Sequence, residues 1–135
     1  MASNFQVSVT VNNTRLDAME TACGASAVLK IWTGTQPANC AAADSGTLLA
    51  NISLPADWMG AAASNLKSKS GTWQDASADN NGTAGHYRIY ASDGTTCHFQ
   101  GTCGTSGADM NLNVAALVAG LPFTVDTYTW AEGNT

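Results

Sequence analysis

Short runs in which apolar and polar residues alternate recur along this chain, and turn-forming residues separate one run from the next. Alternation with a period of two is the signature of a half-buried β-strand. Leu29 and Ile31, for example, share one face of such a run, and Pro55 ends another because it removes a backbone donor. The predicted strands are 27–33, 48–54, 71–75, 86–91, 95–103, 109–114 and 122–131.

The connections between these runs have recognisable turn chemistry. The tract Asp-Asn-Asn-Gly at 79–82 predicts a tight turn, because Asn and Gly tolerate a positive φ. Residues 92–94, Ser-Asp-Gly, join two runs into an expected hairpin. The small residues of 36–46 indicate a structured loop, and the polar stretch 57–70 indicates an irregular connection.

The last run changes phase partway along. Phe123 and Val125 occupy one alternation, whereas Tyr128 and Trp130 occupy the other. A strand keeps one face toward the core only if its alternation is uninterrupted. The pattern therefore predicts a β-bulge, or a strand that is covered on both faces.

The N-terminal residues alternate as well. Phe5, Val7, Val9 and Val11 fall on one side of an extended chain, which predicts a strand over 5–12. We expect residues 1–12 to form an arm ahead of a single domain that spans 13–135.

A short helix is expected after this arm. Thr14 and Asp17 have the spacing of a capping box, and Gly24 supplies a stop. The residues expected on its buried face are Leu16, Met19 and Cys23.

These elements predict a mainly all-β fold, an antiparallel β-sandwich or jelly-roll-like domain of about seven or eight short strands with one short N-terminal helix. The length of 135 residues suits one domain with a substantial core. Only 11% of the residues are charged, against about 25% in a typical globular chain. Ser, Thr, Asn and Gly must therefore supply much of the polar surface, which favours strands and turns.

The charge balance argues against nucleic acid as a partner. The net charge is -5, and the chain has only five basic residues. Proteins that bind nucleic acids concentrate Lys and Arg on one surface. No apolar run approaches the ~18 residues of a membrane helix, and the N-terminus lacks the layout of a signal peptide. We expect no membrane association, and a chain that stays soluble in the cytoplasm in which it is made.

No catalytic or metal-binding constellation is apparent, and we expect neither an enzyme nor a cofactor. His86 and His98 are the only histidines, and no nucleophile or carboxylate stands beside them in a known motif. If the hairpin pairs as expected, the two histidines lie near each other on its solvent-facing side. Alternation places Cys97 and His98 on opposite faces of a strand, which disfavours a metal site there.

The cysteines and tryptophans leave alternatives open. Four cysteines in a chain made in a reducing compartment are expected to stay mostly buried free thiols. A disulfide from Cys40 to Cys97, or to Cys103, is the alternative. Trp32 and Trp58 fit either the core or a protein interface, where tryptophan is enriched.

Five collinear segments resemble a family of small structural proteins of tailed-bacteriophage particles, and the similarity extends over about 15–134. The segments are 37–46 (Pro-Ala-Asn-Cys-Ala-Ala-Ala-Asp-Ser-Gly), 54–59 (Leu-Pro-Ala-Asp-Trp-Met), 67–75 (Lys-Ser-Lys-Ser-Gly-Thr-Trp-Gln-Asp), 82–90 (Gly-Thr-Ala-Gly-His-Tyr-Arg-Ile-Tyr) and 96–98 (Thr-Cys-His).

The resemblance implies a structural role in the virion, and within it we favour a capsid decoration, or cement, protein. Such a protein binds the outside of the head at junctions between capsomers, so the expected partners are the major capsid protein and further copies of the chain, as a trimer. The arm would pair with the edge of a neighbour's sheet. The expected partner-binding residues are Phe5, Val7, Val9, Trp32, Trp58 and Met59.

Two other functions remain open from the sequence. The first is a tail-side fibre or receptor-binding domain that binds a glycan through Trp58 and Tyr90. The second is a small enzyme that acts on cell-wall sugars, which requires paired carboxylates in a cleft. Asp75 and Asp93 are the candidates for that pair, although no motif surrounds them.

Overall fold

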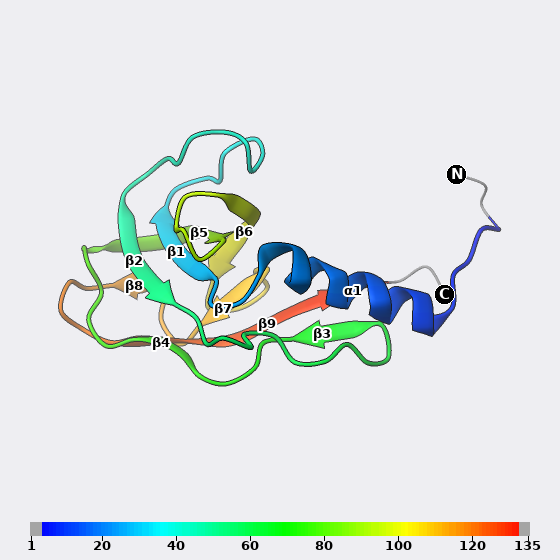
Figure 1. Cartoon of the computed structure of the whole chain (residues 1–135). Coiled ribbons are helices and arrows are strands. Elements are labelled where there is room, and N and C mark those ends of the chain that lie inside the picture. The colour runs from blue at the N-terminus through cyan, green and yellow to red at the C-terminus, as the bar shows by residue number, and fades with distance from the viewer. Residues whose placement is uncertain (1–3, 133–135) are drawn as a thin grey trace.

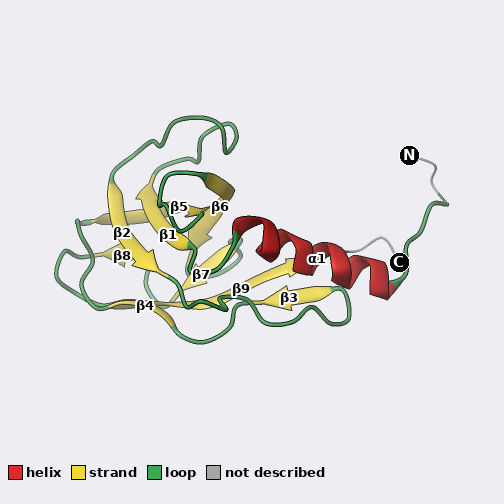
Figure 2. Cartoon of the chain, in the orientation of Figure 1, coloured by secondary structure: helices red, strands yellow, loops and turns green. Residues whose placement is uncertain are grey.

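The structure, a computed structural model, describes residues 4–132 and contains mostly β-strands with one short helix (Figures 1 and 2). This confirms the predicted fold class. Residues 1–3 of the predicted arm lie outside the described residues. The elements are α1 (Val9–Cys23), β1 (Val28–Thr33), β2 (Leu48–Ser53), β3 (Leu66–Ser68), β4 (Trp73–Asp75), β5 (Gly82–Tyr90), β6 (Cys97–Gly104), β7 (Met110–Leu112), β8 (Ala116–Leu117) and β9 (Phe123–Ala131).

The strands form one continuous, curled, mixed sheet in the order β2-β1-β5-β6-β7-β9-β3. Two further strands pair at its sides, β4 with β9 and β8 with β5. Among the described strands, β6 and β7 pair in parallel and the other pairs are antiparallel. The curl closes the sheet over one core, whose largest side chains include Trp58, Trp73, Phe123, Ile89 and Met110.

The phase change in β9 is a β-bulge, as predicted. Met110 pairs with Tyr128, whereas Leu112 pairs with Val125, so β9 carries one more residue than β7 over this stretch. The extra residue lets Val125 and Tyr128 both face the core.

The predicted strand over 5–12 is wrong, because α1 begins at Val9. Ser8 caps the helix, and its hydroxyl accepts a hydrogen bond from the Val11 N–H at 3.2 Å. Thr14 does not cap; its hydroxyl donates to the Thr10 carbonyl one turn earlier. The valines had the spacing of a strand, but Val9 and Val11 lie exposed on the first turn of a helix that ends, as predicted, before Gly24, and Val7 precedes it.

Polar contacts attach α1 to the connection that was expected to be irregular. This connection contains β3, which pairs with the end of β9. Lys67 of β3 is only 3% exposed and donates to Asp17 at 2.7 Å and to the Gly60 carbonyl at 2.7 Å. Its ammonium also lies 2.9 Å from Glu20. The strand was missed because the inward residue of this short segment is a lysine rather than an apolar side chain.

Candidate functional site

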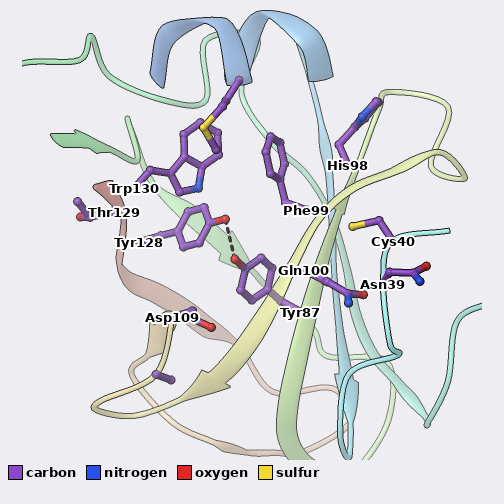
Figure 3. A pocket seen from close by; sticks show the side chains of 12 residues that line it. Asn39, Cys40, Tyr87, His98, Phe99, Gln100, Asp109, Tyr128, Thr129 and Trp130 are labelled. Atoms are coloured by element: carbon purple, nitrogen blue, oxygen red, sulfur yellow. Dashed lines mark hydrogen bonds between the residues drawn. The ribbon is translucent and has the colours of Figure 1, made fainter. Parts of the chain in front are cut away.

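A groove opens where β6 and β9 separate. The strand β7 bridges them at one end only, through Cys103 and Gly104 on β6. Beyond that bridge lies a cavity of about 730 Å³ (Figure 3). Met19 of α1 is among its lining residues. We call it the aromatic groove; its principal lining residues are Tyr87, Phe99, Tyr128, Trp130, Gln100 and Asp109.

Aromatic rings form the floor of the groove. The hydroxyls of Tyr87 and Tyr128 are 2.7 Å apart and hydrogen-bonded to each other (Figure 3). The ring centroids of Phe99 and Trp130 are 4.8 Å apart, and Phe99 is the partly exposed member of the pair. Gly101 allows the Tyr87 ring to lie close to the backbone of β6, because a Cβ at this position would be 2.8 Å from that ring.

The floor is uncharged. Burial raises the pKa of Tyr128 to about 12 and raises the pKa of Tyr87 still further. The nearby Asp109 carboxylate acts in the same direction on both phenols. Both tyrosines therefore remain protonated at any ordinary pH, and they supply hydroxyl groups and ring surface rather than an acid or base.

Polar side chains surround this floor. Asp109 is held in place because its Oδ2 accepts from the Thr102 backbone N–H at 2.9 Å and from the Thr102 hydroxyl at 3.1 Å. Asn39 and Gln100 lie on the other side of the groove (Figure 3). Asp109 is the only carboxylate among the lining residues, so the groove lacks the carboxylate pair of a glycoside hydrolase. Binding is the chemistry that this arrangement supports.

The loop over 34–47, which we call the clasp loop, forms part of this rim. It joins β1 to β2 and arches over β5 and β6 (Figure 1). Arg88 of β5, 1% exposed, holds it through a hydrogen bond to the Asp44 carboxylate. The same guanidinium donates to three backbone carbonyls of the loop, those of Asn39, Cys40 and Ala42. Residues 36–46 are thus structured, as the sequence predicted.

Three of the predicted partner-binding residues belong to the interior. Trp58 and Met59 are 0% and 1% exposed, and Trp32 is 9% exposed. Their burial contradicts a role as surface anchors, and Tyr90, at 1%, is equally closed to a glycan. Trp58 packs against three other aromatic rings, so the core alternative is correct for it.

The other predicted partner-binding residues lie at the surface, ahead of the helix and on its first turn. Phe5 is 48% exposed and Val9 is 44% exposed, while Val7 is partly exposed. They lie ahead of α1 or at its first residue, whereas Met19, the helix residue that lines the groove, lies near the other end of the helix. The predicted set is therefore split between core and surface, and none of it lines the aromatic groove.

The two histidines are not neighbours. His86 pairs across the sheet with Thr102, four residues beyond His98, so they lie at different levels of the hairpin. His86 is fully buried, stacks on Trp32 and contacts the Gly34 carbonyl at 2.9 Å, whereas His98 is exposed. The prediction of two adjacent, solvent-facing histidines is wrong because His86 packs against the Trp32 ring and the Gly34 backbone.

The cysteines are free thiols in the structure. Cys97 lies against Cys40 of the clasp loop, and burial together with this contact raises the Cys97 pKa to about 12. Cys103 is buried with the main core. A disulfide between Cys40 and Cys97 stays a prediction.

Neither a metal site nor a membrane span is found in the part of the chain that the structure describes. No group of three or more His, Cys, Asp or Glu side chains gathers within residues 4–132. No helix in that range has the length and apolar character needed to cross a membrane.

Asp93, one of the two aspartates considered for a carboxylate pair, is engaged within its own turn. Its Oδ1 accepts hydrogen bonds from the backbone N–H groups of Thr95 and Thr96.

Sequence reasoning missed the aromatic groove because its lining comes from α1, β5, β6, β9 and two loops. Tyr87 and Phe99 had the alternation of core residues, and nothing in a linear pattern shows that the sheet opens beside them. The signal that was available is the glycine at 101, two residues after Phe99 and inside a predicted strand, since a glycine inside a strand marks a close approach.

Comparison of the chain with protein-family models, with curated proteins and with solved structures finds no match to any of them.

Proposed function

We propose that this chain is a structural protein of a tailed-bacteriophage particle, and that it binds the outside of the head as a decoration protein. The phage-like segments over 37–98 suggest the particle. The observation that carries the proposal is the apolar surface at one end of the molecule, where the chain begins.

This surface, which we call the apolar tip, brings together two parts of the chain. The first part holds Phe5, which precedes α1, and Val9, the first residue of α1. The second part holds Leu66, which begins β3 and is 48% exposed. Hydrogen bonds tie the two parts to each other, because the Asn12 side chain donates to Asn65 at 3.0 Å. Figure 1 shows α1 and β3 side by side at this end of the molecule.

An exposed apolar surface of this kind favours a protein partner. Burying it against another subunit gains about 25 cal/mol for each Å² of apolar area. A modest gain per copy suffices in a shell, since many copies act across the same particle. The partners we propose are the major capsid protein and, at a symmetry axis, other copies of this chain.

The test is in vitro decoration of capsids that lack the protein. The variant Phe5→Ser/Val9→Ser removes apolar surface from the tip but keeps the Ser8 cap of α1. We expect at least a tenfold loss of bound copies per capsid, measured by quantitative gel.

The matched control is Val118→Ser/Leu121→Ser. These residues are 47% and 55% exposed, and they lie in the β8 to β9 connection, away from the tip. The control should bind as the unmodified chain does. Equal binding by both variants would contradict the role of the tip. A copy number in the tens rather than the hundreds per virion would contradict decoration and favour a tail-side component.

A further inference from the structure

We propose that the aromatic groove is a binding site for a neutral carbohydrate with the size of a disaccharide. The groove lies away from the apolar tip, so this inference does not depend on the proposed role in the capsid. It goes beyond that role, because it gives the protein a small-molecule ligand of its own.

The floor of the groove suits the C–H face of a pyranose ring. An aromatic face carries partial negative charge, and it attracts the weakly positive hydrogens on one side of a sugar. Phe99 offers the partly exposed ring, and Trp130 supports it from a centroid distance of 4.8 Å with the ring planes 37° apart. The ring is therefore held in position before a ligand arrives.

The rim offers hydrogen-bonding groups of the kind that hydroxyl groups require. One oxygen of Asp109 is held by Thr102, which aims a carboxylate at the groove. The Oδ1 atom of Asn39 accepts from the backbone N–H groups of Ala41 and Ala42. That arrangement fixes the side chain and leaves its NH₂ group as a donor.

Gln100 adds an acceptor that lacks a partner. Its Nε2 donates to the Pro37 carbonyl at 2.7 Å, so the amide is anchored to the clasp loop. Its Oε1 is buried and has no hydrogen-bond partner among the described residues. A buried amide oxygen without a partner is unfavourable, and a small side-chain shift would bring it to a ligand hydroxyl.

Charge separates a neutral sugar from the other ligand classes. No lysine or arginine lines the groove, and the guanidinium of Arg88 is occupied by the clasp loop. The lining includes one histidine, the exposed His98. An anionic ligand would meet the Asp109 carboxylate without a compensating lysine or arginine. A purely apolar ligand would cover Asp109, Asn39 and Gln100 and leave their polar atoms unpaired.

The size and rigidity of the groove agree with this assignment. A volume of about 730 Å³ lies within the range of small-molecule sites and leaves room for two sugar rings. Arg88 fixes the clasp loop, and the Tyr87–Tyr128 hydrogen bond fixes the floor. A site that is already formed loses little conformational freedom on binding.

The experiment is an NMR titration of the full chain with three neutral disaccharides: lactose, maltose and N,N′-diacetylchitobiose. Sialyllactose, choline and benzyl alcohol represent an anion, a cation and an apolar molecule. We expect at least one neutral disaccharide to bind in the millimolar range and to shift the resonances of Phe99, Gln100 and Asp109.

Two variants locate the site. Asp109→Asn keeps an oxygen for Thr102 but removes the charge, and Asn39→Ala removes the free NH₂ group; each should weaken binding at least fivefold. The matched control is Asp57→Asn, which removes an exposed aspartate outside the groove and should bind as the unmodified chain does.

Three results overturn the proposal. The first is no response to any of the neutral disaccharides. The second is a response that persists undiminished in Asp109→Asn and Asn39→Ala. The third is stronger binding of choline or benzyl alcohol to the groove. None of these results bears on capsid binding, which the Phe5→Ser/Val9→Ser variant tests separately.

Discussion

Two peripheral elements, the helix α1 and the clasp loop, are each attached to the sheet by one buried cation, but the two attachments differ. Lys67 reaches two carboxylates on the helix, those of Asp17 and Glu20. Arg88 reaches one carboxylate, that of Asp44, and three backbone carbonyls. The helix is thus attached through side chains, whereas the loop is attached largely through its backbone.

The difference follows from what each element leaves unsatisfied. A helix pairs its own carbonyls, so only side chains remain for a contact. The clasp loop has no regular structure, and its carbonyls need donors from elsewhere. An arginine, with five N–H groups in a planar fork, satisfies several of them at once, which a lysine cannot do.

Removing the arginine should therefore have the largest effect. In Arg88→Met, three loop carbonyls lose their donor and the Asp44 carboxylate keeps only the Tyr90 hydroxyl. Breaking the ion pair costs about 3 kcal/mol, the lower end of the range for buried pairs, because the Asp44 side chain is 38% exposed. We expect the free energy of unfolding in urea to fall by about that amount. A fall of less than about 1 kcal/mol would show that the loop does not depend on this contact.

The same variant has a local readout in the Cys97 thiol. Its pKa, raised to about 12, makes it a poor nucleophile while the clasp loop covers it. Alkylation by iodoacetamide, mapped by mass spectrometry, should be faster at Cys97 in Arg88→Met, and Cys103 in the main core serves as the internal control. The same alkylation experiment on the unmodified chain shows whether a disulfide bond joins Cys40 and Cys97.

Neither attachment could be predicted from the sequence. Arg88 occupies a polar position in an alternating strand, and Lys67 lies in a stretch that resembles a surface loop. Their burial depends on segments distant in the chain: Asp44 is 44 residues from Arg88, and Asp17 is 50 residues from Lys67. Local patterns instead predicted what depends on neighbouring residues, such as the hairpin and the bulge in β9.

The same distinction explains the N-terminus and the groove. The valines of the first turns match a strand as well as a helix, and the Ser8 cap together with the docking through Lys67 decides in favour of the helix. Trp58 and Met59 were assigned to a surface because a linear pattern gave no partner for them. In the fold, the curl of the sheet encloses both of them.

Removing the lysine should have a smaller effect than removing the arginine. In Lys67→Met the stem still fills its place, and Asp17, whose side chain is 50% exposed, can return to water. The loss is that of hydrogen bonds to a charged group, about 1.5–3 kcal/mol. We expect this fall in urea unfolding, with weaker helical circular dichroism if α1 leaves the sheet. A loss equal to that of Arg88→Met would remove the contrast between the two attachments.

The smallest effect should come from acid, which weakens both attachments at their carboxylates. For Asp44, partial burial raises the pKa, but hydrogen bonds from Tyr90 and Arg88 outweigh it and leave the pKa below its usual value. Hydrogen bonds from Lys67 and from the Ala62 N–H lower the pKa of Asp17. A carboxylate with a lowered pKa in the folded state stabilises the protein above its unfolded pKa, about 3.9, and loses that contribution as the pH falls through the folded value.

Stability should therefore be constant from neutral pH to about pH 5 and should decline below about pH 4. Asp44→Asn and Asp17→Asn should each flatten part of that decline, which urea unfolding at a series of pH values will measure. Asp57→Asn, at an exposed site without an ion pair among the described residues, should keep the full decline. The Asp44 variant should remove more of it, because the Asp44 side chain is 38% exposed and that of Asp17 is 50% exposed, and water screens the more exposed pair more strongly. If the Asp17 variant removed more of the decline, the helix rather than the clasp loop would be the attachment that depends more on its charge.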